Sequence, residues 1–202
     1  MLRMSRRDAG LLGLAGLCAA TLARPRAAGA ADLGELVIGD PAAPVTMVEY
    51  ASLSCHHCAE FHKGTLPALK ARYIDTGKVK LVFRDFPLEK NAFAAAKIAR
   101  CAGPERRARF VDVFFAQQDG WSHAKDPVAT LRQLARLGGL GEQAVDACLA
   151  DKAVEDAVLA SGLEGQQRYK VSSTPTFVIN GQVYPGNRTV EEFAKILDPL
   201  LG

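Results

Sequence analysis

The amino-acid sequence predicts an α/β fold with an inserted all-helical subdomain. Strand-like residues at 45–50 and 79–83 enclose a segment in which apolar residues recur at helical spacing, and this order is typical of a βαβ unit with parallel strands. Residues 174–184 contain two more strand patterns joined by Asn-Gly, the strongest short hairpin signal. Between these parts, residues 91–168 show helical patterns throughout.

The first 30 residues predict a signal peptide for export. A basic start is followed by an apolar run over residues 9–23, and Ala28-Gly29-Ala30 supplies a cleavage site, so we expect cleavage after about Ala30. The apolar run is too short to span a bilayer comfortably, and Leu17 argues against a lipoprotein signal centred on Cys18. The letters SRRD near the start also resemble a twin-arginine signal, so two export routes stay open.

Export changes the net charge of the chain that remains. The whole sequence has a net charge of +3, and its first 30 residues carry five arginines and one aspartate, which leaves −1 for residues 31–202. We therefore expect no nucleic-acid partner. A small group of arginines is interpreted as a solvated helix face: Arg100, Arg106, Arg107 and Arg109.

The sequence CHHC at residues 55–58 lies where the strand VTMVEY gives way to the helical segment, which ends near Gly77. The first N–H groups of a helix have no intrahelical partner and its dipole favours negative charge, so a thiolate at Cys55 is stabilised by up to about one and a half pKa units. A protonated histidine in the same turn adds positive charge. We therefore expect Cys55 to be the attacking sulfur and Cys58, one turn further on, to be shielded.

Other interpretations of this motif are weaker. A structural zinc ion needs four converging ligands, and the sequence offers no second close pair of cysteines or histidines, because His62 and His123 are isolated. No metal site is therefore expected. A purely structural disulfide across so short a loop would constrain little entropy of the unfolded chain.

Removal of the signal peptide leaves four cysteines, and an even number in an oxidising compartment favours disulfides. Cys101 and Cys148 form the distant pair, and both lie within helical patterns. A disulfide between them would stabilise the fold by about 4 kcal/mol through loop closure, and two buried free thiols are the alternative. Trp121 and Phe114-Phe115 are assigned to the core of the same segment.

The far end of the chain places Thr174-Pro175 directly before a strand. This position is unusual for proline unless its peptide bond is cis or it occupies the first strand position. Residues 189–201 then predict a closing amphipathic helix, with one apolar face made by Val190, Phe193, Ile196 and Leu197.

Taken together, the stretches VEYASLSCHHCAEFH, FRDFPL and VSSTPTFVINGQVYPG resemble the DsbA family of bacterial periplasmic thiol oxidoreductases. The resemblance covers about residues 36–201 and implies a thioredoxin-like fold. It divides the chain into an N-terminal part of that fold at residues 36–90, a helical insertion that caps the active site at 91–168, and a C-terminal part at 169–202.

The resemblance also implies roles for individual residues. Cys55 matches the nucleophile and Cys58 the resolving cysteine of a redox-active disulfide. His57 matches the histidine that stabilises the Cys55 thiolate. Glu49 matches a buried acid that helps to move protons at Cys58.

Two further matches lie in the distant loop, and one position departs from the family. Pro175 matches the cis-proline that lies against the dithiol, and Thr174 offers backbone pairing to a bound peptide. The same threonine also occurs in isomerase-type relatives. His56 stands where the best-known members have proline, and we expect it to alter the redox potential in a direction that stays open.

The sequence thus predicts a periplasmic enzyme, a monomer without a cofactor, that donates the Cys55–Cys58 disulfide through a mixed disulfide at Cys55. Its partners would be reduced exported proteins and, as the family implies, a membrane quinone-linked reoxidase. An isomerase or reductase with the same fold is one alternative. A copper-binding periplasmic chaperone and a non-catalytic peptide-binding module are the others.

Overall fold

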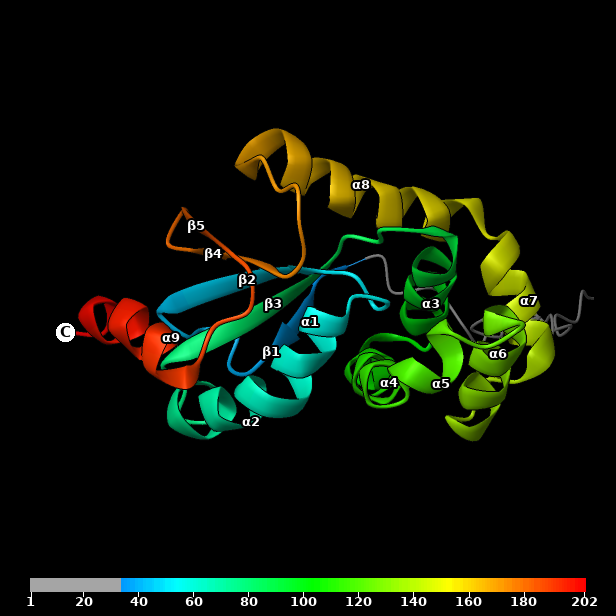
Figure 1. Cartoon of the computed structure of the whole chain (residues 1–202), viewed down its shortest axis with the longest axis horizontal. Helices are drawn as coiled ribbons and strands as arrows, with labels where there is room; N and C mark the ends of the chain where they lie inside the picture. Colours follow the sequence, from blue (N-terminus) through cyan, green and yellow to red (C-terminus); the bar gives the residue numbers. More distant parts are fainter. Residues whose placement is uncertain (1–33) are drawn as a thin grey trace, which may run out of the picture.

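A computed structural model of the chain describes residues 34–202. The signal peptide expected at residues 1–30 lies outside the described residues. The described part contains a five-stranded mixed sheet with helices on both faces, and a group of helices packs at one end of that sheet (Figure 1). Among residues 34–202, no helix combines the length and the apolar character needed to cross a membrane.

The sheet has the strand order β1-β3-β2-β4-β5. β2 and β3 are parallel, as the βαβ pattern predicted, and the other neighbours are antiparallel. The strands are β1 (Leu36–Ile38), β2 (Val45–Ala51), β3 (Val79–Asp85), β4 (Thr176–Ile179) and β5 (Gln182–Pro185). The turn between β4 and β5 has positive φ at both Asn180 and Gly181, the backbone conformation for which Asn-Gly is favoured.

A single run of helical turns connects β2 to β3. It begins as α1 (His56–Glu60) and continues through π-helical turns at Phe61–Thr65 (η1), α2 (Leu66–Leu69) and further π-helical turns at Lys70–Ile74 (η2). Pro67 lies in this run and has no N–H to donate, so the regular hydrogen-bond ladder is interrupted around it. We refer to residues 56–74 below as the active-site helix.

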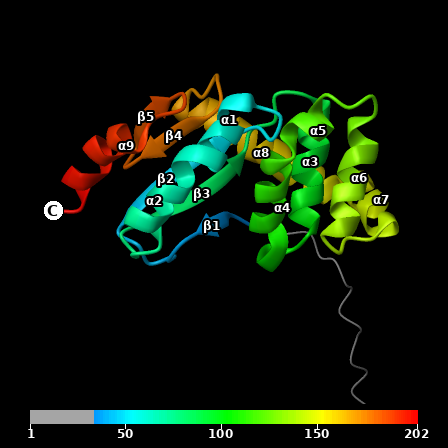
Figure 2. The same cartoon turned by 60° about the horizontal axis from the view of Figure 1, so that its bottom comes forward.

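Alternation along β2 decides what lies beneath this helix. Val45 and Met47 pack in one core with the active-site helix and with α9 (Val190–Leu197), whereas Tyr50 packs on the opposite face near the end of α8 (Lys152–Tyr169). Figure 2 shows the sheet between these two helical layers. Because side chains alternate at a period of two, Glu49 points to the face of Val45 and Met47, under the active-site helix.

The inserted segment forms a helical subdomain whose core is continuous with the sheet and the active-site helix, because one buried cluster also contains Leu53, Cys58 and Phe83. Phe114, Phe115 and Trp121 are fully buried in it, as expected, and Cys101 and Cys148 are joined by a disulfide. Outside this insertion, the short turn Asp198–Leu200 (η3) follows α9 near the C-terminus. The helices of the insertion are α3 (Lys90–Cys101), α4 (Pro104–Ala116), α5 (Gln118–Ser122), α6 (Pro127–Leu137), α7 (Glu142–Ala150) and α8.

The interpretation of the arginine cluster as a solvated face was wrong for two of its members. Arg100 and Arg107 are only 4% and 0% exposed. Arg100 Nε donates to Asp85 Oδ2 at 2.7 Å, and Arg107 Nη2 donates to the same oxygen at 3.1 Å. Asp85 ends β3, so this carboxylate joins the sheet to α3 and α4 and supplies the countercharge that burial of the guanidinium groups requires. Arg109 is exposed, as expected.

Candidate active site

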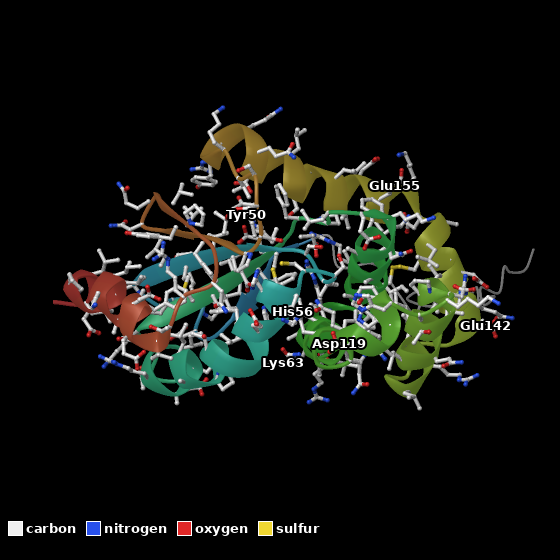
Figure 3. All side chains as sticks on the ribbon, viewed as in Figure 1. Tyr50, His56, Lys63, Asp119, Glu142 and Glu155 are labelled. Atoms are coloured by element: carbon white, nitrogen blue, oxygen red, sulfur yellow. A yellow bond between two sulfur atoms is a disulfide. The ribbon has the colours of Figure 1, made fainter. Side chains whose placement is uncertain are left out.

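The dithiol occupies the junction between β2 and α1. Cys55 is the N-cap residue of α1 with extended backbone, and its N–H donates to the carbonyl of Ser52 at 3.0 Å. Cys58 lies one turn further on and is fully buried, whereas Cys55 is partly exposed. His56, at the start of α1, and Asp119, on the neighbouring helix α5, are labelled in Figure 3, where the helical subdomain borders the start of the active-site helix.

The loop before β4 lies against Cys55. The peptide bond between Thr174 and Pro175 is cis, and the Cys55 thiol donates to the carbonyl oxygen of Thr174 at 3.3 Å. The Thr174 hydroxyl is buried without a hydrogen-bond partner. It is therefore available to a thiolate at Cys55. The structure thus brings together two segments that the sequence analysis singled out and that lie 119 residues apart.

The pKa values of the two cysteine thiols are shifted in opposite directions. The pKa of Cys55 is lowered from 9.0 to about 5, mainly by a hydrogen bond from Cys58, with further contributions from the Thr174 side chain and from the backbone at Cys58 and His57. The pKa of Cys58 is raised strongly, first by burial and then by its hydrogen bond to Cys55 and by the nearby carboxylate of Glu49. The asymmetry was predicted from helix position and from the charge of a neighbouring histidine; its largest source is instead the thiol–thiolate hydrogen bond.

The two histidines of the motif lie on the rim of the site. Their side chains are 67% and 68% exposed, and both contact Glu60, at 3.2 Å from His56 Nε2 and 2.8 Å from His57 Nδ1. The pKa of His57 is raised, mainly by its hydrogen bond to Glu60 and only to a small extent by the charge of Cys55. Of His57, the backbone contributes to the lowered pKa of Cys55, while its ring is hydrogen-bonded to Glu60.

Beneath the dithiol, Glu49 and His62 form a buried pair. Glu49 is fully buried, and its Oε2 lies 2.9 Å from His62 Nε2. The sequence indicates an isolated histidine at position 62 and does not predict this contact. The available signal was helical spacing, because His62 follows Cys58 by four residues and precedes Leu66 by four, which places it on the buried face of the helix.

Gln118 is a second residue that sequence reasoning missed. Its buried amide donates from Nε2 to the carbonyl of Leu53 at 2.7 Å and to that of Cys55 at 3.0 Å. The helical subdomain therefore holds the backbone on both sides of the nucleophile's loop. No local sequence pattern predicts such a contact, because the donor and its two acceptors are more than 60 residues apart in the sequence.

Within residues 34–202, no three side chains of His, Cys, Asp or Glu converge as ligands of a metal ion would. His56, His57 and Glu60 are close together, but they point into solvent around an exposed carboxylate.

Comparison with known proteins agrees with this architecture. The family model described as "Thioredoxin" matches residues 31–199. A protein of Rickettsia typhi, provisionally named a protein-disulfide oxidoreductase, is 32% identical over 171 residues, which is 84% of this chain and 63% of that protein. A similarly named protein of Rickettsia felis is also 32% identical, over 61% of its length. The chain thus spans less than two thirds of these curated relatives.

Solved structures show the same fold. The crystal structure of Wolbachia pipientis alpha-DsbA1 has a TM-score of 0.77 at 30% identity, covering 84% of this chain and 92% of that one. BdbD from Bacillus subtilis, in the oxidised state, has a TM-score of 0.75 at 22% identity, covering 86% and 97%. The thioredoxin-like fold with an inserted helical subdomain is therefore confirmed.

Proposed function

The chain belongs to the thioredoxin family, and on this premise we propose that it is a DsbA-type protein thiol–disulfide oxidoreductase that donates the Cys55–Cys58 disulfide to reduced exported proteins in the periplasm. One observation carries this proposal. Cys55 is stabilised as a thiolate while its neighbour Cys58 is kept as a buried thiol. A stabilised Cys55 thiolate favours the reduced form of the protein, which makes its disulfide an oxidant.

The reaction follows from this asymmetry. A substrate thiolate attacks Cys55 Sγ, the Cys55–Cys58 bond breaks, and Cys58 leaves with the electron pair and takes up a proton. The second thiolate of the substrate then attacks the substrate sulfur of the mixed disulfide, and Cys55 leaves as its stabilised thiolate. The substrate loses two electrons to the dithiol, and no cofactor takes part.

The remaining components belong to the same proposal. The signal peptide at residues 1–30 exports the chain, and the protein acts as a monomer. The backbone of Thr174 beside cis-Pro175 pairs with the bound peptide next to Cys55, which supports a polypeptide as substrate. A membrane quinone-linked reoxidase restores the disulfide.

The reduction potential tests the direction of electron flow. We would equilibrate the purified protein in glutathione buffers and follow alkylation of Cys55 by mass. The expected potential lies well above that of thioredoxin, about −270 mV. Cys55→Ser is the control, because it must abolish the redox-dependent signal. A thioredoxin-like potential would reject the donor and favour a reductase or isomerase, whereas stoichiometric copper binding that needs both cysteines would favour the chaperone.

A further inference from the structure

The buried pair of Glu49 and His62 has an unpaired atom at each end. Glu49 Oε2 lies 2.9 Å from His62 Nε2, while Glu49 Oε1 and His62 Nδ1 are buried without a hydrogen-bond partner. A buried polar atom without a partner destabilises a fold, so two in one contact call for an explanation in the protein's function. Both groups exchange protons readily, which suggests what that function is.

The first end of the pair faces the dithiol. The carboxylate of Glu49 acts electrostatically on Cys58, and Glu49 lies on the face of β2 that the active-site helix covers. Cys58 must gain a proton when the disulfide opens and lose one when it closes. Because Cys58 is fully buried, water cannot serve it directly.

The second end of the pair faces a cavity. His62 Nδ1 lies 4.0 Å from Asp112 Oδ1 of α4, a separation that one bridging water would close. Asp112 is 65% exposed, so it reaches solvent. The cavity has a volume of about 430 Å³ between the active-site helix and α4, and its lining includes His62, Asp112, Lys63, Lys70 and Asp75.

Aromatic rings enclose the other sides of the imidazole. The ring of Phe115 lies 4.2 Å from that of His62 between centroids, and the ring of Phe83 lies 5.9 Å away. These contacts hold the imidazole between Glu49 and the cavity and exclude water from its faces. The edge that carries Nδ1 is the one directed toward Asp112.

We propose that His62 relays protons between Glu49 and the cavity beside Asp112, and so supplies the proton that Cys58 exchanges each time the disulfide opens or closes. The inference rests on the proposed function. On opening, Glu49 gives a proton from Oε1 to Cys58 Sγ and accepts the Nε2 proton of His62 at Oε2, and His62 takes a proton from cavity water at Nδ1. On closing, each transfer runs in reverse, so the two half-reactions restore the starting tautomer without net change.

The charged groups that face this route come from three elements. Glu49 belongs to β2 and Asp112 to α4. The active-site helix contributes Cys58 at one end of the route and two lysines at the cavity, Lys63 (labelled in Figure 3) and Lys70. Asp75 also lines the cavity, just beyond the end of that helix. Asp112 is the acid within 4.0 Å of His62 Nδ1 and therefore the group whose charge should matter most for proton entry.

Closure of a preformed mixed disulfide isolates the step. Reduced protein is converted to its Cys55–glutathione disulfide, and the rate at which Cys58 displaces glutathione is followed by acid quench and mass across a range of pH. Glutathione gains the proton that Cys58 loses, so the reaction balances. We expect His62→Gly to slow closure by about tenfold or more, since positioned acid–base groups typically contribute at least that much.

Chemical rescue separates relay from structure. Imidazole added to His62→Gly should restore the rate, because it can accept a proton at one nitrogen and release another. 1-Methylimidazole fills the same space but has one nitrogen blocked, so it should not restore the rate. Equal rescue by both compounds, or an unchanged rate in His62→Gly, overturns the relay.

A surface variant keeps the test decisive if His62→Gly does not fold. Asp112→Asn should slow closure and shift its pH profile, whereas Asp75→Asn, which removes the same charge from the same cavity, should leave both unchanged. Equal behaviour of these two variants overturns the route through Asp112. If the wild-type mixed disulfide never closes, the proposed function fails instead, so the two failures are distinct.

Discussion

Replacing Cys58 with alanine should raise the pKa of Cys55, because the hydrogen bond from Cys58 is the largest of the effects that lower it. Alanine removes the donor and adds no competing group. Serine at the same position keeps a hydroxyl donor in nearly the same place. The two variants therefore separate the hydrogen bond from the helix terminus and from Thr174, which both retain.

The size of the change follows from the kind of bond. A hydrogen bond to a charged acceptor contributes about 1.5–3 kcal/mol. At 1.36 kcal/mol per unit, its loss raises the pKa by about one to two units. From a starting value of about 5, the pKa of Cys55 should therefore rise to roughly 6–7 in Cys58→Ala. In Cys58→Ser, the pKa of Cys55 should stay near the wild-type value.

The assay is the ultraviolet absorbance of the thiolate as a function of pH, repeated as the pH dependence of alkylation by iodoacetamide. Cys55 is then the one free thiol among the described residues, so both signals report on it. If the alanine and serine variants titrate together at the wild-type pKa, the hydrogen bond is not the dominant effect. The helix terminus and Thr174 would then have to carry the shift.

Three further predictions test other parts of the structure. The folded reduced protein has a Cys55 pKa of about 5 against 9.0 for an ordinary thiol, so its free energy of unfolding should fall as the pH is lowered from 9 through 5. The oxidised protein, measured alongside by urea denaturation, should lack this dependence. Parallel curves for the two forms would contradict the lowered pKa. Asp85→Asn should destabilise the fold by about 3–5 kcal/mol, because it takes a shared carboxylate from two buried guanidinium groups. Asp119→Asn, at an exposed position, should change stability by less than about 0.5 kcal/mol. Similar urea midpoints for both variants would show that the fold does not need the carboxylate of Asp85. Gly165→Ala would place Cβ 2.7 Å from the ring of Tyr50 and should cost about 1–3 kcal/mol in thermal unfolding, while Gly162→Ala, on the same helix with its nearest neighbour at 3.9 Å, should gain up to about 1 kcal/mol.

Local spacing was sufficient to predict most of the framework. The β-branched and aromatic residues of VTMVEY, the helical spacing after CHHC and the Asn-Gly turn are each local signals. The short edge strand β1 was missed, because three residues are too few to show alternation. The site was predictable where the motif itself carries the chemistry, as at Cys55, or where proline in an unusual position marks a special turn.

The missed features are contacts between elements. The burial of Arg100 and Arg107 depends on Asp85, which is 15 and 22 residues away in sequence, and an arginine on a helix has the same local pattern whether it faces water or a buried acid. Gln118 and His62 likewise acquire their roles only when α5 and β2 meet the active-site helix. Such pairings are set by topology, which one sequence does not display.

The long reach of these contacts has a consequence for newly made chains. A polypeptide is synthesised from its N-terminus, so Cys55 exists well before Gln118, 63 residues later, and Thr174, 119 residues later. Until Thr174 has been made and has folded back, the pKa of Cys55 lacks the part of its lowering that this residue supplies, so less of the sulfur is present as the reactive thiolate near neutral pH. Full activation of the nucleophile thus waits for the C-terminal part of the chain, and an incomplete copy is less reactive toward its neighbours.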